Sequence, residues 1–369
     1  MKDWYHIEDI NNIDSPSIVL YEDRLMHNLH TMIAMVDGNL SRLIPHIKTN
    51  KMPKVIERMI SLGISDFKAS TIAEAEMATI EGARSVLIAH QLVGPKLSRF
   101  GRLITEYPDT RFTTIIDTIS TVEKLQKEGQ KANIKIGVYI DINSGMDRSG
   151  VKLGTDLEHI LKRLPDYTFI DFLGLHIYDG HFREPDFNHR KQNVEDEITP
   201  VAILFEELRK AKPSLQMICG GTPAFTSHVL ESNRICSPGT CVFWDWGYSE
   251  KLLEQEFKYV ALVVTRVISK PIEGIVTVDL GHKSVGPENP IDKRVKFLNL
   301  KDYELLSQSE EHGVLKVKDW ETIKVGDVFY GVPYHICPTI NLHDEVSVIK
   351  DGKIVGTWDI TARKRKITI

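Results

Sequence analysis

Lys48 is the residue with the clearest chemical potential in this sequence. It ends an apolar run, Leu43–Lys48, that is typical of a β-strand, and His46 shares one face of that run with it. A lysine in partly desolvated surroundings at the end of a strand can lose its proton and attack carbonyl groups. The alternative is an ordinary solvated charge at a strand end. The other motifs of the chain favour the nucleophile.

Two short glycine-containing turns have the composition of a phosphate site. The first contains Gly220, Gly221 and Thr222, and the second contains Gly239 and Thr240. Glycine lets backbone N–H groups approach an anion, and threonine adds a hydroxyl donor. Each turn follows a predicted strand, and together they predict one phosphate-binding pocket.

His335 and Cys337 form a His-x-Cys pair with metal-binding potential. In an extended segment, residues two apart lie on one face, where a single divalent cation reaches both side chains. Two protein ligands leave open coordination positions, which suits a catalytic metal better than a structural one. The alternative is a buried cysteine beside a hydrogen-bonded histidine.

These motifs fall on an alternation of predicted strands and helices. Short apolar runs alternate with segments of helical periodicity, such as Lys54–Leu62 and Val201–Ala211, which predicts parallel βαβ units. The apolar runs are Leu43–Lys48, Phe67–Thr71, Ser85–His90, Phe112–Asp117, Ile134–Ile142, Phe169–Tyr178, Leu215–Gly221 and Ser232–Ser237. Eight such strands over about 230 residues predict an α/β fold of the (β/α)8 TIM-barrel type. The alternative is an open doubly wound sheet.

Polar side chains are expected at the mouth of this barrel. In Phe172–Tyr178, one face is apolar and the other carries His176 and Tyr178. Tyr139 and Asp141 likewise share one face of their strand. Active sites of this fold lie at the carboxyl ends of the strands, and the loops after strands seven and eight commonly hold phosphates. Lys48 is predicted at the carboxyl end of the first strand, and the two glycine turns are predicted in the loops after strands seven and eight.

The composition of the chain changes near residue 255. Beyond it, short β-rich segments such as Val260–Ser269 are joined by tight turns. We therefore predict two domains: a barrel over residues 20–255 and a mostly antiparallel β domain over residues 256–369. Residues 1–19 can contribute to the second domain, and the early strand Ser17–Leu20 can belong to either.

The overall composition excludes several classes of protein. The 369 residues carry a net charge of −5, which argues against nucleic acid as a partner, and the longest apolar runs are too short to span a bilayer. Four cysteines do not form a disulfide framework, and the N-terminus lacks the apolar segment of a secretory signal. We expect a cytoplasmic enzyme with a small-molecule substrate and no membrane or nucleic-acid partner.

Seven short motifs are specific when they are taken together. They are Pro45–Thr49, Asp141–Gly150, His176–His181, Gly220–Pro223, Ser237–Thr240, Glu310–Gly313 and the segment around His335 and Cys337. In this order they resemble the D-threonine aldolase and D-serine dehydratase family, whose N-terminal barrel is of the alanine-racemase type. The resemblance covers nearly the whole chain.

The resemblance implies pyridoxal 5′-phosphate (PLP) as the cofactor, held as a Schiff base on Lys48. His46, in the same motif, is expected beside the cofactor. Arg148 resembles the arginine that contacts the phenolic oxygen of PLP, and Tyr178 corresponds to a residue beside the pyridine ring. The phosphate would be held by Gly220, Gly221, Thr222, Gly239 and Thr240.

The remaining implied roles concern the metal and the proton transfer. His181 resembles the histidine proposed as the base in the aldolases, and His335 with Cys337 matches a pair that holds Zn²⁺ or Mn²⁺. Family members are typically head-to-tail dimers, so we expect a homodimer. Asn50 departs from the family pattern, because many relatives have a histidine two residues after the lysine. A proton relay at that position is therefore in doubt.

The resemblance implies a PLP- and divalent-metal-dependent lyase that acts on β-hydroxy-D-amino acids. We favour cleavage of D-threonine to glycine and acetaldehyde, because Tyr178–His181 resembles the aldolase version of that motif. The closest alternative is a D-serine dehydratase or 3-hydroxy-D-aspartate lyase, since a His-x-Cys pair also occurs in D-serine dehydratases. An amino-acid racemase and a non-catalytic PLP-binding protein are more remote. A racemase needs no metal pair, and such PLP-binding proteins lack the β domain.

Overall fold

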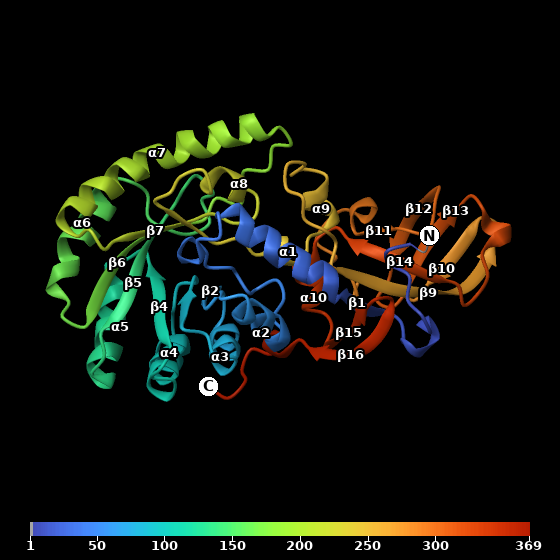
Figure 1. Cartoon of the computed structure of the whole chain (residues 1–369), viewed down its shortest axis with the longest axis horizontal. Helices are drawn as coiled ribbons and strands as arrows, with labels where there is room; N and C mark the ends of the chain where they lie inside the picture. The colour runs from blue at the N-terminus through green and yellow to red at the C-terminus, as the bar shows by residue number, and fades with distance from the viewer. Residues whose placement is uncertain (1–2) are drawn as a thin grey trace.

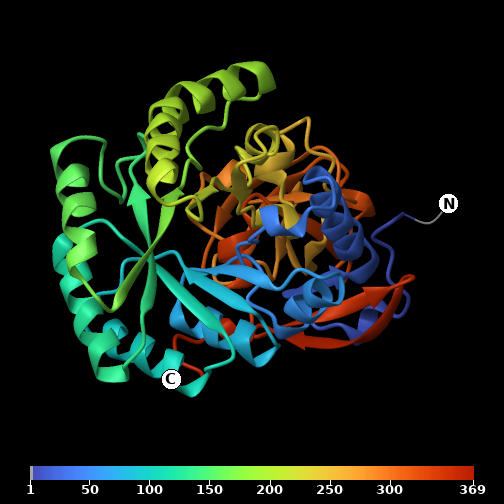
Figure 2. The same ribbon diagram turned by 60° about the vertical axis from the view of Figure 1, so that its left-hand side comes forward.

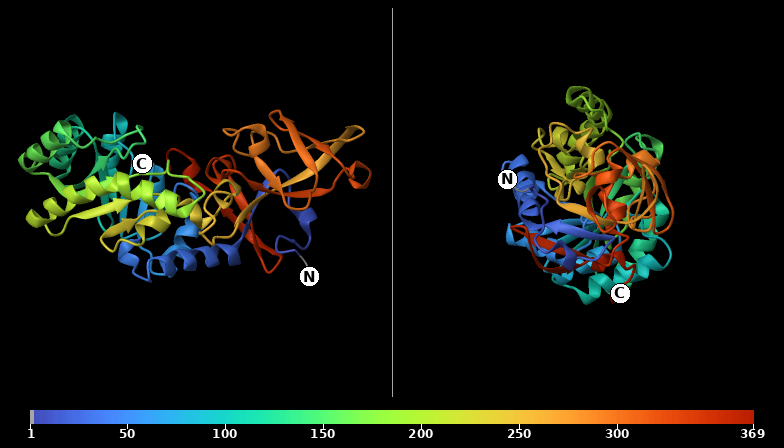
Figure 3. Two further views of the ribbon diagram at one scale, coloured as in Figure 1. Left: turned by 90° about the horizontal axis from the view of Figure 1, so that it is seen from above. Right: turned by 90° about the vertical axis from the view of Figure 1, so that its right-hand side faces the viewer.

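The computed structural model describes residues 3–369 as a barrel joined to a β domain. Figure 1 shows the barrel with its helices at one end and the orange and red strands of the second unit at the other. Seen from above in Figure 3, the two units lie end to end and give the molecule an elongated shape.

Seven parallel strands form the wall of the barrel in the order β2-β3-β4-β5-β6-β7-β8. They are β2 (Asp66–Ala69), β3 (Ser85–Ile88), β4 (Arg111–Ile116), β5 (Ile136–Ile142), β6 (Ile170–Ile177), β7 (Gln216–Cys219) and β8 (Arg234–Cys236). Figure 2 shows how these strands curl around a common axis. Every residue of β5 is buried, as expected for a strand that is covered on both faces.

The segment Leu43–Lys48 closes the barrel between β8 and β2, but it is not a regular strand. Leu43 pairs with Cys236 and His46 pairs with Lys68, each through an isolated parallel bridge. Pro45 has no N–H to donate and interrupts the hydrogen-bond ladder. The predicted barrel is confirmed, with seven regular strands and this irregular closing segment in place of eight regular strands.

An apolar layer fills the inside of the barrel below the mouth. Leu87, Ile115, Tyr139, Ile218 and Ile235 form one buried cluster. Asp141 and His176 lie farther along β5 and β6, toward the carboxyl ends of these strands. The apolar layer therefore separates the polar groups at the mouth from the opposite end of the barrel.

The helices follow the strands and cover the barrel from outside. They are α1 (Glu22–Met35), α2 (Pro53–Ser61), α3 (Ile72–Ile80), α4 (Pro95–Glu106), α5 (Ile119–Ala132), α6 (Thr155–Arg163), α7 (Phe187–Ala211) and the short α8 (Phe225–His228). Thr71 and Thr118 begin α3 and α5 as side-chain N-caps. Among the residues that the structure describes, no helix is long and apolar enough to cross a membrane.

The second unit is a nine-stranded, mostly antiparallel sheet, as predicted. Its strands are β1 (Ser17–Tyr21), β9 (Ala261–Ile272), β10 (Ile275–Val278), β11 (Val295–Phe297), β12 (Tyr303–Gln308), β13 (Gly313–Val317), β14 (Val328–Pro333), β15 (Glu345–Lys350) and β16 (Lys353–Asp359). Strand β1 pairs with β9 and with β15, so the early strand lies in this sheet and not in the barrel. Two short helices, α9 (Trp246–Ser249) and α10 (Ile336–Ile340), lie where the sheet meets the barrel.

The last residues of the chain run back from the β domain to the outside of the barrel, beside α3 and α4 (Figure 1). The backbone N–H of Thr368 donates to Glu76 Oε1 at 3.0 Å, and the Arg99 guanidinium donates to the Ile369 carbonyl at 2.6 Å. These contacts tie the two units together at a second place.

Candidate active site

A cavity of about 370 Å³ lies at the mouth of the barrel. Four of the residues predicted to bind the cofactor line it: His46, Lys48, Arg148 and Tyr178. The other lining residues include Lys68, His90, Gln91, Ser149 and His176. Its volume is within the usual range of a small-molecule site.

Lys48 is half-buried and faces an aromatic ring across this cavity. Its Nζ lies 5.3 Å from the centre of the Tyr178 ring, and the Arg148 guanidinium carbon lies 4.4 Å from the same ring. His46 holds the segment in place, because its Nδ1 is 2.9 Å from the Lys68 carbonyl. Burial, followed by the charge of Lys48, lowers the pKa of His46 well below its ordinary value, so this ring is neutral. Lys48 is therefore the amine at the cavity that a carbonyl group can reach.

The two glycine turns meet around the hydroxyl of Thr222. The backbone N–H groups of Gly239, Thr240 and Cys241 lie 3.2, 3.0 and 3.4 Å from Thr222 Oγ1. Three N–H donors that converge on one oxygen form the kind of concave nest that binds anions. These three donors fit a phosphate group. In this structure, Thr222 Oγ1 accepts from them in the place that a phosphate oxygen would take.

Both turns are packed directly against the lysine segment and the aromatic ring. A Cβ on Gly239 would lie 2.8 Å from the His46 carbonyl, and a Cβ on Gly221 would lie 3.0 Å from the Tyr178 ring. Side chains at these positions would force the turns away from the cavity. The residues present therefore fit PLP: an amine, a flanking aromatic ring and an anion nest are neighbours.

The His-x-Cys pair lies at the same place, but its backbone is not the extended segment that the sequence predicts. His335 is extended and precedes α10, whereas Cys337 is within that helix. The helix begins here because Asp245 accepts a hydrogen bond from the Ile336 N–H at 3.1 Å and satisfies one of its free donors. Cys337 Sγ then lies 3.2 Å from Thr49 Oγ1 and 3.5 Å from Thr240 Oγ1. The pair is thus brought between the lysine segment and the second glycine turn.

The side chains of His335 and Cys337 shift each other's pKa. Burial would raise the pKa of Cys337, but His335 and Lys48 lower it below its ordinary value. Burial would lower the pKa of His335, but Cys337, Asp245 and Glu288 raise it to about 9. A thiolate beside an imidazole is a donor set that suits Zn²⁺, and a bound cation would replace the proton on His335. Within residues 3–369 no group of three or more His, Cys, Asp or Glu side chains is arranged to hold a metal ion, so His335 and Cys337 are a pair of candidate ligands and not a complete set.

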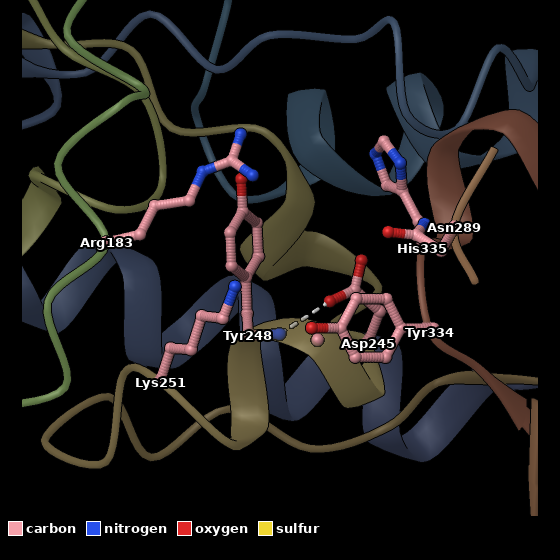
Figure 4. A pocket seen from close by; sticks show the side chains of 8 residues that line it. Arg183, Asp245, Tyr248, Lys251, Asn289, Tyr334 and His335 are labelled. Atoms are coloured by element: carbon pink, nitrogen blue, oxygen red, sulfur yellow. Dashed lines mark hydrogen bonds between the residues drawn. The ribbon is translucent and has the colours of Figure 1, made fainter. Parts of the chain in front are cut away.

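A second, smaller cavity of about 60 Å³ adjoins His335. Figure 4 shows the Tyr248 hydroxyl beside the Arg183 guanidinium, and the Asp245 carboxylate accepting the Tyr248 N–H at 2.9 Å. Burial raises the pKa of Asp245 to about 6, although His335 acts in the opposite direction. Arg183 belongs to the loop after β6, so this cavity lies between His335 and the loop that contains His181.

His181, the second predicted catalytic residue, is not among the described residues that line either cavity. Its ring packs on Phe182 with the ring centres 4.0 Å apart. Its Nδ1 is buried and has no hydrogen-bond partner among the residues described. The role of His181 as a base stays a prediction.

Lys68, which lies in β2 and lines the main cavity, is not among the site residues predicted from the sequence. A signal was present, since Lys68 lies between Phe67 and Ala69, and a lysine among apolar residues must point either to solvent or to a polar interior. The analysis placed Asp141 and His176 at the mouth but did not foresee that they pair, with Asp141 Oδ1 2.7 Å from His176 Nδ1.

The fold and the site define a barrel enzyme of the kind that uses PLP. The chain belongs to the family described as the alanine racemase N-terminal domain, whose model matches residues 21–245. In the second unit, residues 261–349 match the family described as a putative serine dehydratase domain.

Individual relatives agree with these matches over nearly the full length. The chain is 25% identical to a D-threonine aldolase from Arthrobacter sp. over 96% of this chain and 94% of that protein. It is 27% identical to a 3-hydroxy-D-aspartate aldolase from Paracoccus denitrificans over 96% and 93% of the two chains. The crystal structure of D-threonine aldolase from Filomicrobium marinum superposes with a TM-score of 0.86 at 27% identity, over 95% of this chain and 96% of that one. The predicted family resemblance and fold class are confirmed.

Proposed function

We propose that this chain is a PLP- and divalent-metal-dependent lyase for β-hydroxy-D-amino acids, and that it cleaves D-threonine to glycine and acetaldehyde. The observation that carries the proposal is the contact between Cys337 Sγ and Thr49 Oγ1 at 3.2 Å, one residue after Lys48. It joins the candidate metal pair to the candidate Schiff-base lysine in one site. The aldolase names of two relatives that align over nearly the whole chain support this choice.

The cofactor would be held from three sides. Lys48 supplies the amine that binds its carbonyl, and the N–H groups of Gly239 and Thr240 supply the phosphate nest. Arg148 and Tyr178 fix the plane of the ring, because the guanidinium and the aromatic ring are already in contact. When bound, PLP supplies the electron sink that makes breaking a bond at Cα possible.

The metal ion would be held by His335 and Cys337, as Zn²⁺ or Mn²⁺, and would act as a Lewis acid on the β-hydroxyl group of the substrate. The protein's own contribution is to keep this pair beside Lys48. Glu288 Oε1 lies 2.7 Å from His335 Nδ1 and orients that ring.

The aldolase and dehydratase readings differ in which residue moves the proton. In the aldolase, His181 takes the proton of the β-hydroxyl group, and its unpartnered Nδ1 supports this role. In the dehydratase, Lys48 takes the proton from Cα, and a metal held by His335 and Cys337 would supply the Lewis acid for the loss of hydroxide. The alignment with a D-threo-3-hydroxyaspartate dehydratase from Delftia sp., which covers 46% of this chain, keeps the dehydratase as the second candidate.

Replacing His181 by alanine tests the aldolase proposal. We expect the wild-type enzyme to release glycine from D-threonine and H181A to release it about 10²- to 10⁴-fold more slowly, the usual effect of losing a general base. The absorbance change on adding D-threonine should persist, because Lys48 and the phosphate nest are intact. His159, exposed on α6, gives the matched control H159A, which should keep its full rate. Glycine release by H181A at the wild-type rate would exclude His181 as the base.

We also propose that the enzyme is cytoplasmic and works as a homodimer. Free thiols at Cys219, Cys236, Cys241 and Cys337 are compatible with a reducing compartment. Gel filtration with light scattering tests the dimer.

A further inference from the structure

Lys68 is a second lysine in the main cavity that the proposed function does not use. It lies in β2, bridged through its backbone to His46 in the segment that carries Lys48, and it is only 1% exposed. Its side chain crosses into the barrel and lines the same cavity as Lys48. A buried charged group needs hydrogen-bond partners, so the partners of Lys68 indicate its task.

The partners of Lys68 engage only one of its three N–H groups closely, so its capacity to donate to a ligand is not used up. Lys68 Nζ lies 2.5 Å from Ser237 Oγ, 3.4 Å from His176 Nε2 and 3.5 Å from the Gly220 carbonyl. The Ser237 hydroxyl donates its own proton to the Gly220 carbonyl at 2.7 Å, so toward Lys68 it is an acceptor. An ammonium group carries three donors and no acceptor. The contact with Ser237 Oγ is short, whereas the contacts with His176 Nε2 and the Gly220 carbonyl are longer than a usual hydrogen bond.

His176 is the other group that faces the same space, and its nitrogen on that side, Nε2, carries no proton. Asp141 Oδ1 lies 2.7 Å from His176 Nδ1, and hydrogen bonds from His176, Ser149 and Gln91 lower the pKa of Asp141 although burial alone would raise it. Burial and the charge of Lys68 lower the pKa of His176, so its ring is neutral. The proton is on Nδ1, and Nε2 is an acceptor. Of these two groups, Lys68 is therefore the N–H donor at the inner wall of the cavity.

PLP has three kinds of hydrogen-bond acceptor, and the proposed site would supply partners for two of them. The phosphate fits the nest at Gly239 and Thr240, and Arg148 is placed for the phenolic oxygen. The pyridine nitrogen is left, on the side of the ring opposite the carbon that joins Lys48. Gly220 and Ser237, which contact Lys68, adjoin the two phosphate turns. We propose that the Lys68 ammonium donates a hydrogen bond to the pyridine nitrogen of PLP.

This inference rests on the proposed use of PLP and adds a control on the strength of its electron sink. A lysine amine is a stronger base than a pyridine nitrogen, so the shared proton stays on Lys68. Burial, followed by the charge of Lys48, lowers the pKa of Lys68 to about 7, while Asp141, Asp179 and Cys219 act to raise it. Lys68 has N–H groups to donate in both its charged and its neutral form. The pyridine nitrogen thus accepts a hydrogen bond without becoming protonated. An unprotonated ring withdraws electrons less strongly than a pyridinium.

The test uses PLP labelled with ¹⁵N in the ring and bound to the full-length protein. Nuclear magnetic resonance should show an unprotonated, hydrogen-bonded nitrogen in the wild type. In K68M the signal should move toward that of a free pyridine nitrogen. The PLP dissociation constant should rise about 10- to 100-fold, the range for one lost charge-assisted hydrogen bond. K68Q, which keeps an N–H donor, should recover part of both effects, and K96M, at an exposed lysine on α4, should match the wild type.

Either of two resonance results would overturn the inference: a protonated pyridinium nitrogen in the wild type, or an unchanged nitrogen signal in K68M. The wild-type spectrum alone decides the question if K68M does not fold. Borohydride reduction that attaches PLP to Lys68 would also overturn it. If the wild type binds no PLP at all, the proposed function fails as well, whereas PLP on Lys48 with a protonated ring nitrogen contradicts only this inference.

Discussion

Replacing Lys48 by alanine should abolish the covalent attachment of PLP and reduce turnover by about 10⁴-fold or more, as the loss of a covalent catalytic group does. Lys48 is the amine beside Tyr178 and the phosphate nest, and Lys68 is held by Ser237 and His176 on the inner wall. The variant should still bind PLP weakly, because the nest at Thr222 is unchanged. Borohydride reduction followed by peptide mass spectrometry measures the attachment.

Lys54 gives the control for this variant, because it is exposed on α2 and its ion pair is with Glu57, one turn along the same helix. K54A should carry PLP on Lys48 and keep the wild-type rate. If K48A retains a reducible attachment at another lysine together with turnover, Lys48 is not the Schiff-base residue.

Removal of the metal should reduce turnover by about 10²-fold or more while PLP remains bound, since the cation acts on the substrate and not on the cofactor. Chelation with EDTA, H335A and C337A should all have this effect, and added Zn²⁺ or Mn²⁺ should restore only the chelated wild type. Absorbance of bound PLP and elemental analysis are measured on the same samples.

His312 gives the control for these variants, because it is exposed in the β domain between β12 and β13. H312A should keep both metal and rate. Full turnover by protein that elemental analysis shows to be free of metal would contradict the role of His335 and Cys337.

The sequence predicts the barrel well because its strands are buried on one face or both and alternate with amphipathic helices. It fails at Leu43–Lys48, where the apolar pattern is that of a strand but Pro45 breaks the ladder. It also fails at the His-x-Cys pair, because α10 begins through a hydrogen bond to Asp245, which is 91 residues away from Ile336 in the sequence. A cap from so distant a residue leaves no local signal.

In the candidate site too, some residues are revealed by a local motif and others only by the folded structure. Lys48 and the glycine turns are recognisable because each is a local motif at the end of a strand. Lys68 is not, since its function depends on Ser237 and His176, which only the closed barrel brings to it. Likewise, the spacing of His335 and Cys337 does not reveal that Cys337 reaches Thr49.

The most direct test of the account is the product formed from D-threonine by enzyme supplied with PLP and Zn²⁺ or Mn²⁺. Chromatography of the quenched reaction, with separate detection of amino acids, aldehydes and 2-oxo acids, measures all products together. The proposed aldolase gives glycine and acetaldehyde in equal amounts, without 2-oxobutanoate. Formation of 2-oxobutanoate and ammonia without glycine would contradict the aldolase and establish the dehydratase in its place.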